Sequence, residues 1–321
     1  MESIFFSGFL SMLEALARVF LVILVAGILV RKKVISQEQI NALSKATVIV
    51  FLPALVFANT LEHFNPSDLP FWWILPIIGI LMSTIGFLFA AGVFAVDFKK
   101  HKNLTALASM QNAGYLVLPI GQVIYPDHFG EFALITFLFI LGYNPLLWTL
   151  GKYLSTSSSE SNVKFKYTDL ITPPAVANII SLLIVLLGLN KSFPAFFVDS
   201  VSLVGEAAVP VATFVLGATL GTVSLRKFPK LWNIIRVIVV KYVLLPVATI
   251  AVLLWLKVYD TNPLLADFFV IQAAAAPATG LILQVRTYGG DVQKVAEMML
   301  LTYVACLIAL PFWIAVWHVL V

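Results

Sequence analysis

The sequence predicts an all-α polytopic membrane protein with about ten transmembrane helices, arranged as two inverted five-helix repeats in which helices four and nine are broken and cross. Three observations lead to this fold class. Of the 321 residues, 61% are hydrophobic and 11% are charged, whereas soluble domains contain about 45–50% apolar and about 25% charged residues. Apolar windows long enough to cross a bilayer follow one another along the chain. The prolines inside these windows recur in the same order in the two halves.

The apolar windows define the predicted helices, and the mean hydropathy of the whole chain is +1.00. The windows lie at about residues 13–30, 42–61, 71–96, 103–125, 132–150, 172–189, 197–220, 232–256, 265–285 and 295–319. Most of the 20 Lys and Arg residues follow the odd-numbered windows. By the positive-inside rule these loops are cytoplasmic, which places both termini outside a cell inner (plasma) membrane. The net charge of +4 is therefore a topology signal, and no basic stripe indicates nucleic-acid binding.

A hydrophilic stretch at residues 152–168 divides the windows five and five. We therefore predict a first five-helix repeat at residues 1–151, a cytoplasmic linker at 152–168 and a second repeat at 169–321. The prolines pair across the linker as Pro53 with Pro210, Pro76 with Pro246, Pro119 with Pro277, and Pro145 with Pro311. Because each repeat holds an odd number of helices, the second enters the membrane from the opposite side, and the repeats are inverted.

The stretch from Gln111 to Gln122 predicts a break in the fourth helix. It begins with two amides, Gln111 and Asn112, which are followed by Gly114 and Pro119, and a proline inside a helix removes a hydrogen bond and clashes with the preceding turn. A break near the membrane midplane must be buried in protein or line a cavity. Residues 272–284, around Pro277, form the counterpart in the ninth helix. Inverted repeats with interrupted helices place a substrate site at the repeat interface, so we expect the two breaks to cross there.

The broken helices predict an anion site. The second halves of the two helices begin near Pro119 and Pro277, and their N-terminal N–H groups carry partial positive charge that suits a carboxylate. Asn112 is the first candidate for direct contact, with Gln111 beside it; the alternative is an amide that only satisfies the broken backbone. Gly114 and Gly280 are predicted to supply permissive backbone. Packing is the alternative to a lining role for the remaining candidates, Tyr115, Gln122, Thr279 and Gln284.

Two ionisable residues inside the windows are candidates for ion coupling, because charged groups in membrane helices are costly and usually functional. Glu206 would carry a coupling proton if it is buried, and Lys241 would pair with it or attract the anion. The alternatives are that Glu206 reaches the outer interface and that Lys241 extends to the cytoplasmic one. No dense carboxylate cluster indicates a sodium site, which leaves proton and sodium coupling open.

The sequence predicts neither a cofactor nor a metal site. Cys306 is the single cysteine, and the four histidines are scattered without ligand spacing. No phosphate-binding loop indicates ATP drive. No nucleophile with an accompanying base falls at membrane depth, so we expect a protein that is not an enzyme.

These stretches resemble the auxin efflux carrier family. The matching text runs from Asn112 to Pro119 in the fourth window, from Ala276 to Thr279 in the ninth, and over Tyr288-Gly-Gly-Asp291 after it. The resemblance implies a bacterial organic-anion permease type with an elevator mechanism. In that arrangement helices three to five and eight to ten move against helices one, two, six and seven. Bile-acid:sodium symporters share a similar overall plan.

Together these features predict a secondary active or potential-driven transporter of small organic anions, such as carboxylates or auxin-like acids, that works by elevator-type alternating access. The alternatives are a cation/proton or sodium-coupled transporter of related architecture, a bile-acid-like symporter, and a passive channel. The expected partners are the organic anion and the lipid bilayer. An exposed apolar face on the scaffold half would allow a homodimer.

Overall fold

The computed structural model describes residues 2–156, 171–223, 228–287 and 291–321, and it confirms a polytopic, all-helical fold. Within the described residues, seven helical segments are long and apolar enough to cross a membrane: Phe5–Arg31, Gln37–His63, Ile74–Val93, Pro126–Ser155, Ala195–Gly221, Leu231–Leu256 and Val292–Leu320. A shorter apolar helix, Pro173–Leu186, and two broken helices occupy the remaining three apolar windows of the sequence.

The elements follow the predicted windows in order. Helix one is α1 (Glu2–Arg31), helix two joins α2 (Gln37–Ala46) to α3 (Leu52–His63), and helix three is α4 (Ile74–Val93). Helix four is broken into α5 (Phe98–Ser109) and α6 (Val117–Ile124), and helix five joins α7 (Phe129–Leu146) to α8 (Lys152–Ser155). In the second half, helix six is α9 (Pro173–Leu186), and helix seven is α10 (Ala195–Glu206) with α11 (Ala208–Gly221). Helix eight joins α12 (Leu231–Val239) to α13 (Leu245–Leu256), and α14 (Val258–Thr261) follows it. Helix nine is broken into α15 (Pro263–Ala274) and α16 (Gly280–Thr287), and helix ten is α17 (Val292–Leu320).

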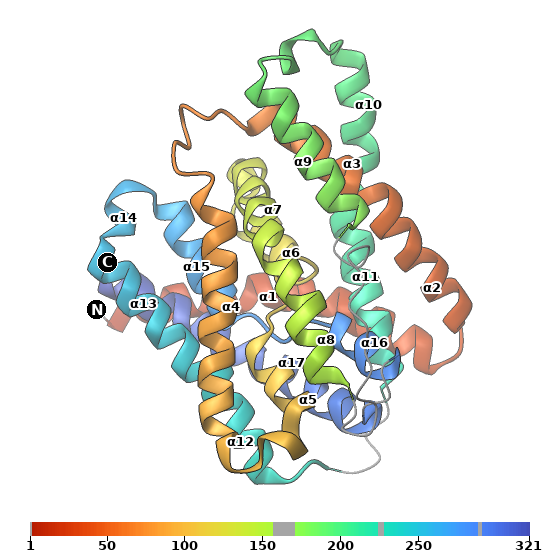
Figure 1. Cartoon of the computed structure of the whole chain (residues 1–321), viewed down its shortest axis with the longest axis vertical. Coiled ribbons are helices and arrows are strands. Elements are labelled where there is room, and N and C mark those ends of the chain that lie inside the picture. Colours follow the sequence, from red (N-terminus) through yellow and green to blue (C-terminus); the bar gives the residue numbers. More distant parts are fainter. Residues whose placement is uncertain (1, 157–170, 224–227, 288–290) are drawn as a thin grey trace.

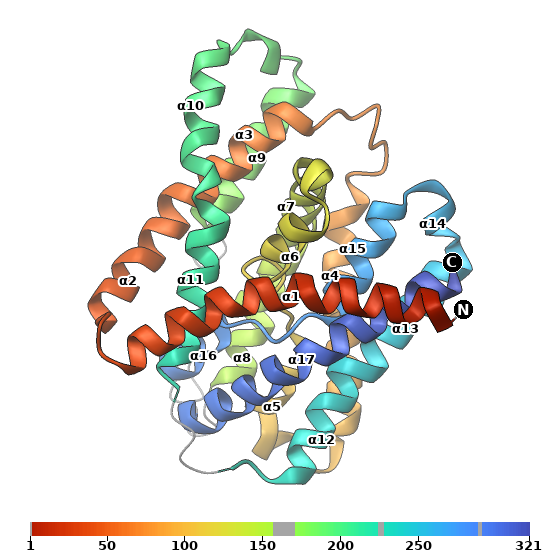
Figure 2. The ribbon, with the colours of Figure 1, turned by 180° about the vertical axis from the view of Figure 1, so that it is seen from behind.

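The helices gather in two groups. In Figures 1 and 2, α2, α3, α9, α10 and α11 lie together on one side, and α4, α5, α12, α13, α15 and α17 lie on the other. The first helix of each half packs against the second helix of the other half, α1 against α11 and α9 against α3. This exchange is what two inverted repeats would produce. The chain ends lie side by side in both views.

Glycines let helices touch through their backbones. A β-carbon added at Gly217 would lie 2.3 Å from the carbonyl oxygen of Ile23, and one at Gly221 would lie 2.6 Å from the Cα of Gly27. These residues join α11 to α1, and small residues four apart are common where membrane helices pack closely. On the other side, a β-carbon at Gly142 of α7 would lie 1.8 Å from the carbonyl oxygen of Pro76 on α4. Both groups of helices are therefore tightly packed.

Large apolar side chains point outward over the helices. Leu21, Leu24, Leu88, Trp255 and Ile308 are all exposed. Water would solvate such a surface poorly, whereas lipid chains cover it without cost. The outer face therefore fits a protein that sits within a bilayer.

The linker prediction needs correction at its start. Residues Lys152–Ser155 form α8, which continues helix five through the π-helical turn η4 (Leu147–Gly151). Lys152, Leu154 and Ser155 are buried, because α8 packs against α5 and α16. Residues 157–170, which make up the rest of the predicted linker, lie outside the described part of the chain.

Candidate functional site

The two broken helices cross where the sequence predicts. α5 ends at Ser109 and α15 ends at Ala274, and the extended segments that follow pair with each other. The amide of Asn112 donates to the carbonyl of Ala276 at 2.7 Å, and the amide of Ala278 donates to the carbonyl of Met110 at 3.1 Å. Each break thus satisfies part of the other's freed backbone, as a buried break within a membrane requires.

Side chains from three helices brace this crossing. The Nδ2 of Asn112 donates to the Oη of Tyr303 at 2.7 Å, and the Tyr303 hydroxyl donates to the carbonyl of Pro277 at 3.0 Å. The hydroxyl of Tyr143 donates to the carbonyl of Gln111. The Nε2 of Gln272 donates to the carbonyl of Ala113 at 3.1 Å. Asn112 therefore joins the two breaks through Tyr303 of α17. This is a structural role for Asn112, similar to the alternative that we gave to direct contact with a substrate.

The crossing also holds polar atoms that have no partner. Gln111 is completely buried, and neither its Oε1 nor its Nε2 has a hydrogen-bond partner among the described residues. The Oε1 of Gln272 likewise has none among them. Because buried polar groups are normally hydrogen-bonded, these atoms leave capacity at the crossing for a ligand or a water molecule.

The position of the first break differs from the prediction. The chain leaves α5 at Met110 and begins α6 at Val117, so Pro119 is the third residue of α6 and not the point of interruption. A proline is tolerated in a first helical turn, where an N–H would lack an intrahelical partner. Pro277 does lie in the second break, between α15 and α16, so the two prolines are not equivalent. Neither Gly114 nor Gly280 has a positive φ, so the permissive backbone predicted for them is not used.

The other predicted lining residues do not all reach the crossing. Tyr115 and Thr279 lie in the breaks and are partly buried. Gln122 is exposed on α6. Gln284 is buried on α16, where its Nε2 donates to the carbonyl of Leu147 at 2.9 Å and so ties helix nine to helix five. Gln122 and Gln284 both lie along the helices that follow the breaks, outside the segments that pair at the crossing.

The two predicted coupling residues lie apart and in different settings. Glu206 is the last residue of α10 and is exposed, so the burial that its coupling role required is absent. α10 ends at Glu206, and the chain turns at Ala207 before α11 begins. Lys241 is completely buried, which rules out extension of its side chain to an interface. The expected pairing of Glu206 with Lys241 is wrong, because the Nζ of Lys241 has no hydrogen-bond partner among the described residues.

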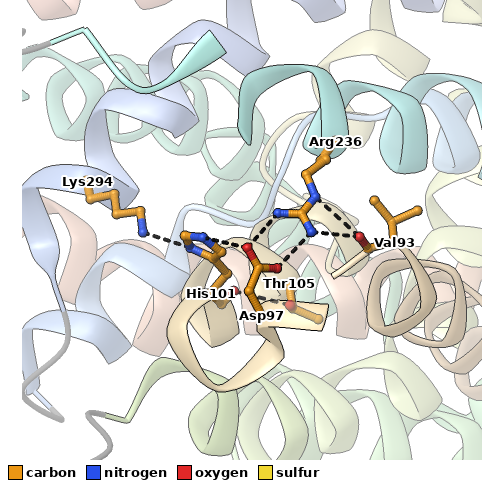
Figure 3. Close-up of polar contacts among 6 residues, drawn as sticks. All are labelled: Val93, Asp97, His101, Thr105, Arg236 and Lys294. Atoms are coloured by element: carbon orange, nitrogen blue, oxygen red, sulfur yellow. Dashed lines mark hydrogen bonds and ion pairs between the residues drawn. The ribbon is translucent and has the colours of Figure 1, made fainter. Parts of the chain in front are cut away.

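A chain of polar contacts that the sequence did not predict holds the start of helix four (Figure 3). Arg236 of α12 donates to both oxygens of Asp97, at 2.7 and 3.0 Å, and also to the carbonyl of Val93. The Nε2 of His101 lies 3.2 Å from the Oδ2 of Asp97. On its other side, the Nδ1 of His101 lies 3.1 Å from the Nζ of Lys294 on α17. This cluster joins helices three, four, eight and ten.

The charges in this cluster fix the state of His101. A lysine ammonium has only donors, so the Nδ1 of His101 accepts from Lys294 and the Nε2–H donates to Asp97. Burial, followed by the nearby Lys294 cation, lowers the pKa of His101, which favours the neutral ring. The hydrogen bond from Arg236 lowers the pKa of Asp97, which keeps that carboxyl ionised. Both groups precede the membrane-spanning part of helix four.

A second carboxylate holds the start of helix nine. Asp267 of α15 is buried and accepts from the hydroxyl of Tyr125 at 2.6 Å and from the Nε1 of Trp317 at 2.8 Å. The Nε2 of His318 lies 3.4 Å away. Together with the Lys294 contact and the Tyr303 contact, these bonds attach α17 to the broken helices at both ends and in the middle. α17 therefore sets the position of the crossing.

Several of these residues escaped the sequence analysis for a common reason. Tyr143, Gln272 and Tyr303 act on residues far away in the chain, and no spacing pattern marks them. From the sequence, Arg236 and Lys294 were interpreted as cytoplasmic charges that set the topology, and Asp267 was interpreted as a residue of an outer loop. For Asp267, one signal was available in the sequence. It is an acid near the start of an apolar window, and Tyr125 and Trp317, which can donate to it, lie near the ends of two other windows.

The fold and the crossing define a polytopic membrane protein with two interrupted helices that meet inside the protein. A family model described as "Membrane transport protein" matches residues 11–314. The chain belongs to this family, which confirms the resemblance to the auxin efflux carrier family.

Curated relatives cover most of the chain. An uncharacterized transporter of Methanocaldococcus jannaschii is 22% identical over 289 residues, which cover 87% of this chain and 90% of the relative. Protein PIN-LIKES 7 of Arabidopsis thaliana is 23% identical over a gapped alignment of 387 positions, which covers 95% of this chain and 98% of the relative. An uncharacterized transporter of Methanothermobacter thermautotrophicus is 28% identical, covering 68% of this chain and 71% of the relative. The chain is thus similar to membrane transporters from end to end.

Proposed function

We propose that this protein is a secondary active or potential-driven transporter of small organic anions that works by elevator-type alternating access, and that it is not an enzyme. The observation that supports this best is the buried crossing, where Asn112 and Tyr303 join the two interrupted helices. Interrupted helices that meet in this way form the substrate sites of many secondary transporters. Membership of a membrane transport family agrees with this proposal.

An anion fits the crossing better than a cation. The N-terminal ends of α6 and α16 follow the two breaks, and helix N-termini favour negative charge. The unpaired Nε2 of Gln111 adds a donor there. The carboxylate of helix nine, Asp267, lies near the start of that helix and accepts from Tyr125 and Trp317 there. These contacts favour a carboxylate guest over the cation/proton antiporter alternative.

The moving body would consist of helices three to five and eight to ten, and helices one, two, six and seven would form the scaffold. The cluster around Asp97 supports this division, because all four helices that it joins belong to the moving body. The first repeat would include α8, and the repeats would divide between residues 156 and 169. The charge distribution supports placing both termini outside the inner (plasma) membrane, and the adjacent chain ends agree with both termini lying on the same side.

Ligand-dependent stabilisation of the purified protein tests the substrate class. We expect a small carboxylate or an indole acid to raise the melting temperature, because a ligand at about 100 times its Kd stabilises the folded state by about 2.7 kcal/mol. The panel should contain carboxylates, indole acids, amino acids, bile acids and monovalent cations at two pH values. Stabilisation by sodium or protons alone, with no effect of any anion, would overturn the substrate assignment in favour of the cation alternative.

A further inference from the structure

Lys241 is a buried amine that no packing role explains. It lies in η7 (Val240–Leu244), a π-helical turn between α12 and α13, and its side chain is 0% exposed. Its Nζ has no hydrogen-bond partner among the described residues. An unpaired ammonium inside a protein is strongly unfavourable, so such groups lose their proton or acquire an anion. π-Helical turns are frequent at functional sites.

The surroundings of Lys241 connect it to the crossing. The η7 turn packs against α4, α5, α15 and α17, and therefore against the first halves of both broken helices. On α17, against which η7 packs, the Sγ of Cys306 donates to the carbonyl of Ala274 at the end of α15. One turn earlier on α17, Tyr303 bonds to Asn112. The turn that carries Lys241 thus packs against α17, the helix that positions the crossing.

The charged groups on these helices do not neutralise Lys241. α4 and α13 contain no ionisable side chain. Among the described residues Lys241 forms no ion pair, and the titratable hydroxyl and thiol groups on the elements packed around it are Tyr242, Tyr303 and Cys306. The other ionisable groups of the packed helices lie in contacts of their own or toward helix ends: Arg236, Lys99, Lys100, His101, Lys102, Asp267, Lys294, Glu297 and His318.

We propose that Lys241 carries the proton that accompanies the organic anion, an inference that rests on the proposed function. The Nζ binds a proton from the side on which a carboxylate enters the crossing, and releases it on the other side after the anion has left. The loaded body then contains one ammonium for one monoanion, and the empty body contains a neutral amine. Neither form carries an unbalanced charge through the membrane, where moving a charge is costly. Each cycle moves one proton and one monoanion in the same direction.

Uptake into proteoliposomes driven by a pH gradient tests this assignment. The probes are radiolabelled succinate, malonate, lactate and indole-3-acetate, measured with an acidic exterior and corrected for empty liposomes. We expect the wild type to accumulate its substrate several-fold when the gradient is present. Lys241→Arg should keep exchange of internal for external substrate, because its loaded form is still neutral, but lose gradient-driven accumulation, since a guanidinium does not release its proton. Lys241→Met should lose gradient-driven accumulation and also slow exchange, because its loaded form carries an unbalanced negative charge.

Lys257→Met is the matched control, because Lys257 is exposed at the end of the same helix, and it should keep the response to the gradient. Equal accumulation by the wild type and Lys241→Met would overturn the role of Lys241 while leaving the transport proposal intact. Absence of exchange for every probe in the wild type would overturn the proposed function itself. If the Lys241 variants do not fold, proton uptake on ligand binding to the wild type, followed with a pH indicator in weak buffer, decides the matter. One proton per bound monoanion supports the proposal, and none overturns it.

Discussion

A disulfide between Gly8→Cys and Ala315→Cys should stop transport completely. Gly8 lies on α1 of the proposed scaffold, and Ala315 lies on α17 of the proposed moving body. A β-carbon added at Gly8 would lie 4.0 Å from the Cβ of Ala315, within the range of about 3.5–4.5 Å found in disulfides. Because an elevator requires these two helices to slide, the cross-linked protein should transport no faster than empty liposomes. Reduction should restore the rate.

The measurement is uptake before and after oxidation, with the cross-link followed by gel mobility. Each single cysteine variant is the control, and Cys306 can remain because it is completely buried. Ligand-dependent stabilisation should survive the cross-link, since the crossing itself is not altered. Full transport by a completely cross-linked protein would exclude relative movement of α1 and α17, and with it this division into scaffold and moving body.

Asn112→Ala should remove most of the affinity for the organic anion. The substitution deletes an amide at the crossing and the hydrogen bond from Asn112 to Tyr303. Losing such a group should cost about 1–3 kcal/mol, which corresponds to a Kd weakened by roughly 5- to 150-fold. The backbone bond from Asn112 to Ala276 remains, so the crossing should still form. Affinity is measured by titrating the stabilising ligand.

Asn178→Ala is the matched control for this variant. Asn178 is also a buried amide, but it donates to the carbonyl of Phe137 at 2.9 Å and joins α9 to α7 away from the crossing. It should lose stability to a similar degree without losing affinity. Unchanged affinity in Asn112→Ala would place the anion site elsewhere.

The sequence predicted the architecture because each membrane helix can be recognised from its own apolar window. Each apolar window and each proline is a local feature, and the crossing followed from two local breaks in matched order. The exact point of the first break did not follow, because Pro119 fits the first turn of α6 as well as it would interrupt a helix. The local sequence therefore locates a helix break only to within a few residues.

The polar partners of the crossing could not be predicted in this way. Asn112 meets Tyr303 from a helix almost two hundred positions away, and the Asp97 cluster draws Arg236 and Lys294 from two other helices. The burial of an ionisable side chain also depends on helices that are distant in the sequence, so it could not be predicted from the residues around it. Glu206 is exposed at the end of α10, and Lys241 is buried because four helices surround it.

Counterflow in proteoliposomes tests most directly whether the crossing is the site of an alternating-access transporter. Liposomes are loaded with an excess of the unlabelled stabilising anion, and entry of the labelled anion is followed at increasing external concentration. We expect the rate of entry to saturate and to be accelerated by the internal anion. A single site must bind the anion on one side and return to that side after release, and it returns faster when it carries the internal anion. A rate of entry that rises linearly with external concentration and does not depend on the internal anion would identify a passive channel. It would contradict alternating access at the crossing.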